Sequence, residues 1–344
     1  MTTIKTALLS FGMSGRVFHA PFINLHKGFE LVGAWERSRQ QIQEVYPSAR
    51  SYSSLELLLA DNSLQLVVVN TPTNTHYDYA KAALLAGKDV IVEKAFTTTV
   101  SEALELKTIA AEKGRKIAVY QNRRWDSDFK TVQQVKQSGV LGDMLEATLR
   151  FERYKPSIGL KQHKEVPGPG AGLLNDLGPH LIDQAVCLFG MPQSLYADIR
   201  TVRENSLVDD WFDISLRYET VRVQLKSSLL VCEQLPGFVL HGTKGSFIKK
   251  RADVQEVDLL AGKLPGTNDW GTEPECDNGI LYTGDNQSTI IQTAQGNYYD
   301  YYDAVYHAIT DNKPMPVTSD DGIAVMRIIA AAVKSNAERK VISL

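Results

Sequence analysis

The sequence predicts an α/β protein in which a doubly wound parallel sheet is followed by a second part built on an antiparallel sheet. Two observations support this prediction. Over the first 120 residues, short apolar runs alternate with helical stretches, and the runs are continuous, as expected for strands covered on both faces. Beyond about residue 122 the apolar residues instead alternate with polar ones, which is the period of a strand with one polar face.

Five continuous apolar runs are the expected parallel strands. Helical stretches lie between them, and two of these, residues 76–86 and 100–113, are each followed directly by a glycine, where a helix C-terminus favours positive φ. Strand, helix and strand in repetition imply right-handed crossovers and a parallel, doubly wound sheet. The expected strands are residues 4–11, 29–35, 64–70, 90–92 and 117–120.

The second half carries the two-residue period most clearly in residues 210–226, which predicts an antiparallel sheet. Residues 262–297 are rich in Gly, Pro, Asn and Asp and give no clear prediction. Further strands are expected at residues 145–154, 195–202 and 238–248, and helices at residues 126–138, 174–189, 298–310 and 321–337.

Composition narrows the class of protein. The chain has 344 residues, so two domains are expected, and with 22% charged residues and a net charge of -3 it shows no sign of a nucleic-acid or membrane partner. Cys187, Cys232 and Cys276 are far apart and form no CxxC pair, which argues against zinc and against a disulfide framework. A reducing cytoplasm fits best, and no residue spacing demands a metal.

A glycine turn, SFGMSG, follows the first expected strand. A dinucleotide fold needs glycines at this junction because the backbone must turn tightly and let a pyrophosphate approach free N–H groups. Gly12 and Gly15 occupy the second and third glycine positions of that fingerprint, and Ser10 replaces the first. We therefore expect Gly12, Ser14 and Gly15 to bind a dinucleotide, although a plain tight turn also explains two glycines.

The end of the second strand bears on the choice between NAD and NADP. An acidic residue there can bind the ribose hydroxyls of NAD, whereas arginine or serine can bind the 2′-phosphate of NADP. Glu36 favours NAD, and Arg37, Ser38 and Arg39 favour NADP. The cofactor expected from these residues is NAD or NADP, and a solvated loop is the alternative.

Longer motifs connect the chain to a known family. Taken with the glycine turn, the strings NTPTNTH after the third strand, EKA after the fourth, and GAGLLNDLGPH in the second half resemble the Gfo/Idh/MocA oxidoreductases over the whole chain. YQNRRWD, DLGPHLIDQ and HGTKGSFIK are most similar to the branch that contains the NADP-dependent scyllo-inositol dehydrogenases. The resemblance implies an N-terminal Rossmann domain and a C-terminal α/β domain with a large open, mostly antiparallel sheet.

Lys94 lies in the segment DVIVEKAF, at the end of a buried strand. The resemblance maps the lysine of the family's EKP motif onto Lys94 and implies a catalytic, substrate-binding ammonium, with Glu93 placing the loop and the cofactor. Ala95 replaces the proline of the motif, and a cis bond before a non-proline residue costs about 3 kcal/mol, which leaves the geometry of this turn open. Without the resemblance, an exposed lysine at a strand end is the favoured interpretation.

Asp176 and His180 are four residues apart and would share one face of a helix. Oxidation of an alcohol needs a base, and the resemblance assigns that role to His180, with Asp176 binding substrate hydroxyls. An Asp/His pair that caps a buried helix is the alternative. The resemblance also implies substrate contacts from Arg124 and Tyr298, for which an ion pair with Asp126 or Asp128 and core packing are the respective alternatives.

The resemblance implies further cofactor contacts and a function. Thr71, Pro72, Asn74 and His76 are expected to bind the dinucleotide. We expect residues 1–122 to form the dinucleotide-binding domain and residues 123–344 the substrate-binding and oligomerisation domain of a cytoplasmic homodimer or homotetramer. The expected activity is an NAD(P)-dependent dehydrogenase acting on a cyclitol or sugar-like polyol. A non-catalytic dinucleotide or sugar sensor and an NAD-dependent glycosidase are the alternatives.

Overall fold

The computed structural model describes residues 2–36, 40–159, 162–252, 254–285 and 287–344. Arg37, Ser38 and Arg39, which bear on the cofactor prediction, lie outside the described residues. The chain forms two compact units. The first comprises Met1–Asn122, Gln255–Trp270 and Asn297–Ile323, and the second comprises Arg123–Val254, Gly271–Gly296 and Ala324–Leu344.

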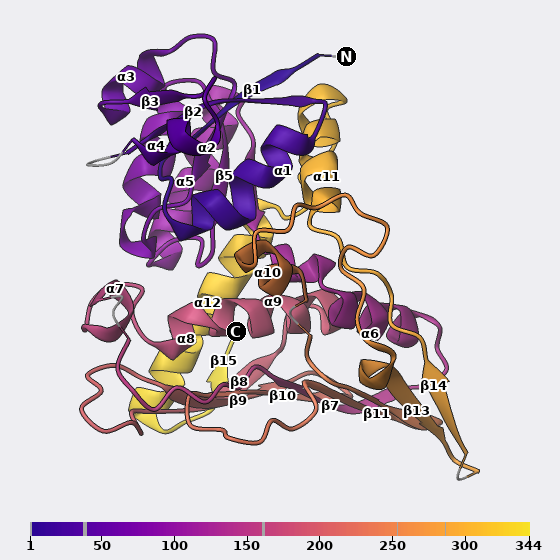
Figure 1. Cartoon of the computed structure of the whole chain (residues 1–344). Helices are drawn as coiled ribbons and strands as arrows, with labels where there is room; N and C mark the ends of the chain where they lie inside the picture. The colour runs from indigo at the N-terminus through magenta and orange to yellow at the C-terminus, as the bar shows by residue number, and fades with distance from the viewer. Residues whose placement is uncertain (1, 37–39, 160–161, 253, 286) are drawn as a thin grey trace. The chain divides into compact units, whose positions relative to one another are not determined.

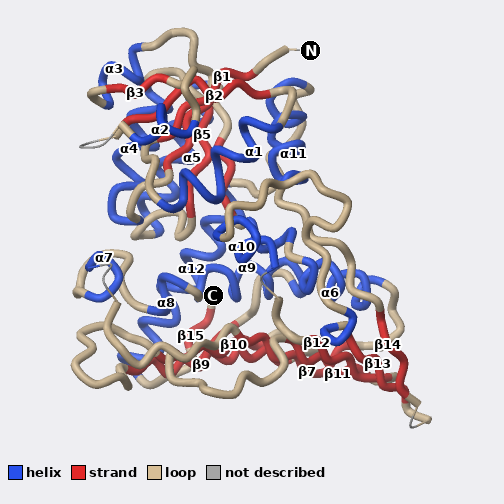
Figure 2. Tube along the Cα trace, viewed as in Figure 1, coloured by secondary structure: helices blue, strands red, loops and turns tan. Residues whose placement is uncertain are grey.

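The first unit contains a six-stranded sheet of order β3-β2-β1-β4-β5-β6 in which every strand pair is parallel. This confirms the predicted doubly wound sheet (Figures 1 and 2). β3 was not predicted, because its three residues are too few to show a period. The strands are β1 (Ile4–Leu8), β2 (Phe29–Trp35), β3 (Arg50–Tyr52), β4 (Leu66–Val69), β5 (Asp89–Glu93) and β6 (Ile117–Tyr120).

Helices cover this sheet, with α4 beside α5 on one side and α1 beside α11 on the other (Figure 1). The Thr99 side chain and Glu102 form a reciprocal capping box at the start of α5, and Gly114 ends that helix at a φ of 60°. The helical segments are η1 (Gly15–His19), α1 (Ala20–Leu25), α2 (Gln41–Val45), α3 (Leu55–Ala60), η2 (Thr73–Thr75), α4 (His76–Leu85), α5 (Val100–Lys113) and α11 (Tyr299–Thr310).

The second unit contains a nine-stranded sheet of order β14-β13-β12-β11-β7-β10-β9-β8-β15. All of its pairs are antiparallel except β7 with β10, which confirms a mostly antiparallel sheet. The strands are β7 (Met144–Arg150), β8 (Ser194–Arg200), β9 (Trp211–Arg217), β10 (Arg222–Ser228), β11 (Phe238–Gly242), β12 (Gly245–Lys249), β13 (Gly279–Thr283), β14 (Ser288–Ile291) and β15 (Ile342–Ser343).

One face of this sheet packs against α6 and α9. The Ser335 and Asn336 side chains of α12 accept hydrogen bonds from the backbone N–H groups of Ala197 and Ile199 in β8. Figures 1 and 2 show no described helix on the other face. The remaining helical segments of the chain are η3 (Asn122–Trp125), α6 (Ser127–Gln137), α7 (Gln162–Glu165), α8 (Leu173–Asp176), α9 (Gly178–Phe189), α10 (Val254–Leu260), η4 (Glu275–Asp277) and α12 (Ser319–Glu338).

Two predictions for the second half were wrong in detail, and one region without a prediction contains strands. Residues 238–248 form two strands, β11 and β12, because the chain reverses at Thr243 and Lys244. Residues 262–297, for which no clear prediction was made, contain the hairpin of β13 and β14. Residues 174–189 do not form one helix: α8 ends at Asp176 and α9 starts at Gly178, since Pro179 lacks the N–H that a continuous helix needs.

Candidate functional site

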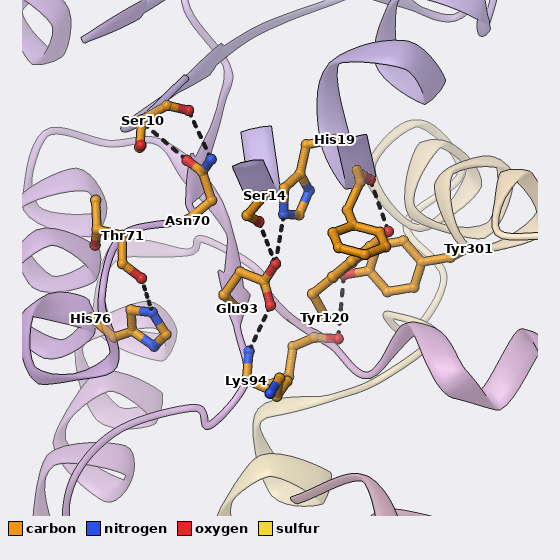
Figure 3. Close-up of polar contacts among 12 residues, drawn as sticks. Ser10, Ser14, His19, Asn70, Thr71, His76, Glu93, Lys94, Tyr120 and Tyr301 are labelled. Atoms are coloured by element: carbon orange, nitrogen blue, oxygen red, sulfur yellow. Dashed lines mark hydrogen bonds and ion pairs between the residues drawn. The ribbon is translucent and has the colours of Figure 1, made fainter. Parts of the chain in front are cut away.

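The glycine turn follows β1 and is hydrogen-bonded to Asn70, the residue after β4. Asn70 Nδ2 donates to the Ser10 carbonyl (2.8 Å) and Ser10 N donates to Asn70 Oδ1 (3.1 Å), as Figure 3 shows. A Cβ at Gly15 would lie 2.3 Å from the Ser10 carbonyl oxygen, so only glycine fits there. A Cβ at Gly12 would meet nothing closer than 3.4 Å, so the fold itself does not require glycine at Gly12.

Glu36 lies at the end of β2, where sequence reasoning placed it, but its carboxylate is engaged with the protein. The backbone N–H groups of Gln41 and Ile42 each donate to one of its oxygens at 3.1 Å. Glu36 therefore caps the first turn of α2.

The turn after β4 is joined to the turn after β5 by His76. The ring of His76 is buried, with Nε2 2.9 Å from the Thr71 carbonyl and Nδ1 2.8 Å from the Ala95 carbonyl. Burial lowers the pKa of His76, so the neutral ring donates to one of these carbonyls at a time. Pro72 is half-buried and Asn74 exposed in the same turn.

Glu93 connects the glycine turn to the lysine loop, the turn after β5 that begins at Lys94 (Figure 3). Its Oε1 accepts from the Ser14 hydroxyl (2.6 Å) and lies 3.1 Å from His19 Nε2, while its Oε2 accepts the Lys94 backbone N–H (3.1 Å). Burial by itself raises the pKa of Glu93, but the hydrogen bonds of His19 and Ser14 and the charges of His19 and Lys94 outweigh it and lower this pKa to about 2. Glu93 is therefore ionised at neutral pH.

Two residues of this network were missed from the sequence. His19 is fully buried, and its Nδ1 lies 2.6 Å from the hydroxyl of Tyr302, which is itself fully buried on α11. The only local signal is a histidine in the otherwise apolar run VFHAPFI just after the glycine turn. Tyr302 is 283 positions away along the chain and gives no signal of its own.

Lys94 is the first residue after β5 and is half-buried. The peptide bond between Lys94 and Ala95 is cis, although Ala95 replaces the proline of the family motif. The parallel strands thus end at an edge that carries the glycine turn, Glu93 and Lys94 within one unit.

In the second unit, Asp176 ends α8 and His180 lies in the first turn of α9. His180 is buried, with its ring 6.4 Å from that of Phe151. Asp176 Oδ1 lies 2.6 Å from Nζ of Lys164, a residue that no sequence motif marks. The break between α8 and α9 replaces the single shared helix that was expected for Asp176 and His180.

Arg124 makes a two-pronged ion pair with Asp183 of α9, through Nε (2.8 Å) and Nη2 (2.7 Å). Arg123, the residue before it, forms an ion pair with Asp126 (3.1 Å). Tyr298, in the first unit, is fully buried beside Phe18 and Phe22, which accounts for its position by core packing. Among the described residues, no three His, Cys, Asp or Glu side chains are grouped as a metal site.

Comparison with known proteins gives two family matches that together cover most of the chain. Residues 4–121 match the NAD-binding Rossmann fold of the GFO_IDH_MocA oxidoreductase family, and residues 133–344 match the C-terminal alpha/beta domain of the same family. None of the described helices combines the length and apolarity that a membrane span requires.

Individual relatives agree with this match. The chain is 35% identical to the scyllo-inositol 2-dehydrogenase (NADP(+)) IolW of Bacillus subtilis, covering 99% of this chain and 96% of that protein. It is also 35% identical to the uncharacterized oxidoreductase YdgJ of Escherichia coli, covering 99% of each. A crystal structure of an oxidoreductase from Bacillus cereus superposes with a TM-score of 0.91 at 33% identity over 99% of each chain.

Proposed function

Because the chain belongs to the Gfo/Idh/MocA family of NAD(P)-dependent oxidoreductases, we propose that it is a dehydrogenase of a cyclitol or sugar-like polyol. The name of the Bacillus subtilis relative, a scyllo-inositol 2-dehydrogenase, supports this class of substrate. In the proposed reaction, a hydroxyl-bearing carbon loses a hydride to the nicotinamide and its hydroxyl loses a proton, which leaves a ketone and a reduced cofactor.

The observation that carries the proposal is the Glu93 network. One carboxylate contacts Ser14 of the glycine turn and the backbone of Lys94, so the segment expected to hold the dinucleotide and the lysine expected to act on the substrate are fixed to each other. An ammonium held there stabilises the negative charge that develops on the substrate oxygen. Cofactor binding and lysine placement thus share one ionised side chain.

The protein's own groups have separate roles in this reaction. His180 accepts the hydroxyl proton, for which an imidazole is suited near neutral pH. Asp176 accepts hydrogen bonds from substrate hydroxyls, and Lys94 stabilises the alkoxide. The dinucleotide, when bound, supplies the hydride acceptor, and the backbone of the Gly12–Gly15 turn holds its pyrophosphate.

We propose NADP as the preferred cofactor. Both oxygens of Glu36 accept backbone N–H groups of α2, which leaves this carboxylate poorly placed to bind the ribose hydroxyls that distinguish NAD. The Bacillus subtilis relative is named for NADP(+).

We propose a cytoplasmic homodimer or homotetramer that associates through the helix-free face of the nine-stranded sheet. The side chains of Tyr196, Ile280 and Tyr282 are exposed, and each alternates along its strand with buried neighbours. Exposed apolar side chains on a broad sheet face favour association with another chain.

A screen of polyols with each dinucleotide tests this function. Reduction of NADP⁺ in step with ketone formation from a cyclitol or sugar is the expected result. Dinucleotide binding without turnover on any polyol would favour a sensor, and cleavage of a glycosidic bond without net cofactor reduction would identify a glycosidase.

A further inference from the structure

Lys164 forms an ion pair with Asp176, and both partners are partly open to solvent. The side chains are 38% and 23% exposed, and Nζ lies 2.6 Å from Oδ1. An ion pair this exposed contributes little to folding stability. The residues next to Lys164 and Asp176 are nevertheless held by charged side chains, two of which, Arg203 and Asp210, are buried.

A buried guanidinium holds the segment that carries Lys164. The Arg203 side chain is 2% exposed, and its Nη2 donates to Glu165, the neighbour of Lys164, at 2.7 Å. Its Nη1 donates to the carbonyl of Ser157 at 3.1 Å. The other Glu165 oxygen accepts the Gly159 N–H at 2.9 Å. Arg203 therefore holds Ser157 and Glu165, the residue next to Lys164.

The segment that carries Asp176 is held by the loop between β8 and β9, which also contains Arg203. Asp209 Oδ2 accepts the Leu174 N–H at 2.7 Å, which anchors the start of α8. A Cβ at Gly172 would lie 2.0 Å from Asp209 Oδ1, so the chain passes directly against this carboxylate. The next residue, Asp210, is fully buried and accepts from Arg203 Nε at 3.0 Å. Two adjacent aspartates thus place Lys164 and Asp176 relative to each other.

We propose that Lys164 and Asp176 together bind two neighbouring hydroxyls of the polyol, with Arg203 as the positioning residue. This inference rests on the proposed function and adds the substrate feature that is recognised. A carboxylate only accepts hydrogen bonds and an ammonium only donates them. The pair therefore matches a vicinal diol, in which one hydroxyl donates to Asp176 and the adjacent hydroxyl accepts from Lys164.

The direct test is Lys164→Met, which keeps the aliphatic stem and removes the donor, assayed with scyllo-inositol as the probe. Loss of a hydrogen bond to a charged group raises KM roughly 10-fold to 100-fold, with kcat within about threefold of the wild type. The KM for the dinucleotide stays unchanged. Lys226→Met is the matched control, because Lys226 pairs with Asp213 at 2.8 Å with side chains 36% and 21% exposed.

Arg203→Lys tests the positioning role, since lysine keeps the charge but not the guanidinium fork. We expect the same rise in KM from Arg203→Lys alone. Adding Arg203→Lys to Lys164→Met should raise KM no further, because both changes remove the same contact between Lys164 and the substrate. Additive effects of the two changes would contradict the role of Arg203 as acting through Lys164. The single Lys164 variant tests the pair even if Arg203→Lys fails to fold.

The outcomes separate this inference from the proposed function. Wild-type turnover of the polyol with an unchanged KM in Lys164→Met overturns the diol-binding pair and leaves the dehydrogenase intact. Absence of wild-type turnover with every polyol overturns the proposed function and the inference with it.

Discussion

His19 Nε2 lies 3.1 Å from Glu93 Oε1 inside the first unit, and this contact sets the charge of the carboxylate that orders the lysine loop (Figure 3). The pKa of Glu93 falls from 4.5 to about 2 although burial by itself raises it. Because this pKa is depressed by folding, the stabilisation it provides is present above pH 4.5 and is lost as the pH falls toward 2.

Removing His19 is predicted to raise the pKa of Glu93. In His19→Leu burial raises the pKa of Glu93, so the acidic limb of the kcat/KM profile moves up by roughly one pH unit or more. His19→Gln, which can keep a hydrogen bond to Glu93, moves the limb less. His307→Gln is the control, because His307 is an exposed histidine paired with Asp311. Superimposable profiles of His19→Leu and the wild type would disprove the coupling.

The two glycines of the turn are predicted to differ. Gly15→Ala forces a Cβ against the Ser10 carbonyl and destabilises the fold by about 1–3 kcal/mol. Gly12→Ala has room in the fold and leaves the melting temperature nearly unchanged, but it weakens dinucleotide binding because the ligand must approach there. Thermal melts and titration with NADP⁺ separate the two effects. Equal dinucleotide affinity in Gly12→Ala and the wild type would place the pyrophosphate elsewhere.

Cofactor preference follows from the role of Glu36. We predict a kcat/KM at least tenfold higher with NADP⁺ than with NAD⁺. Glu36→Gln should change this ratio by less than about threefold and lower stability by about 0.5–2 kcal/mol, the range for a lost helix cap. Steady-state kinetics with both dinucleotides measure the ratio. A wild-type preference for NAD⁺ that disappears in Glu36→Gln would show that the carboxylate binds the ribose.

The second unit contains a fully buried ion pair between Lys249 and Glu273. Lys249→Met leaves the Glu273 carboxylate without its cation and should cost about 3–5 kcal/mol of unfolding free energy. Adding Glu273→Leu should recover much of that loss, because the Glu273 carboxylate is then no longer buried without its cation. Chemical denaturation of the two variants measures both values. If Lys249→Met is as stable as the wild type, the prediction is contradicted, and water must reach the ion pair.

Local sequence patterns were sufficient for the elements with a clear period or cap. β2 and α5 have the bounds that were expected, because FELVGAW is a continuous apolar run and Thr99 with Glu102 marks a helix start. β3 and the β13–β14 hairpin were missed, because their segments are short or rich in turn-forming residues. The break before α9 comes from Pro179, which has no backbone N–H to continue the helix from α8.

The site was predictable only in part, for a physical reason. Glu93 and Lys94 were identified because a family motif marks them in consecutive positions. The contact of His19 with Tyr302 joins residues 283 positions apart, and Lys164 meets Asp176 beside Glu165, whose partner Arg203 lies far along the chain. Such contacts form through tertiary packing, and no local pattern in the sequence predicts them.

The central claim is that Lys94 and His180 perform the chemistry, and steady-state kinetics of Lys94→Ala and His180→Ala with dinucleotide titrations test it most directly. We predict that both variants bind NADP⁺ like the wild type but lose at least about 100-fold in kcat, as removal of a proton-transfer or charge-stabilising group does. Lys113→Ala, which changes an exposed lysine at the end of α5, should keep wild-type kcat. Wild-type turnover in either catalytic variant would contradict the mechanism.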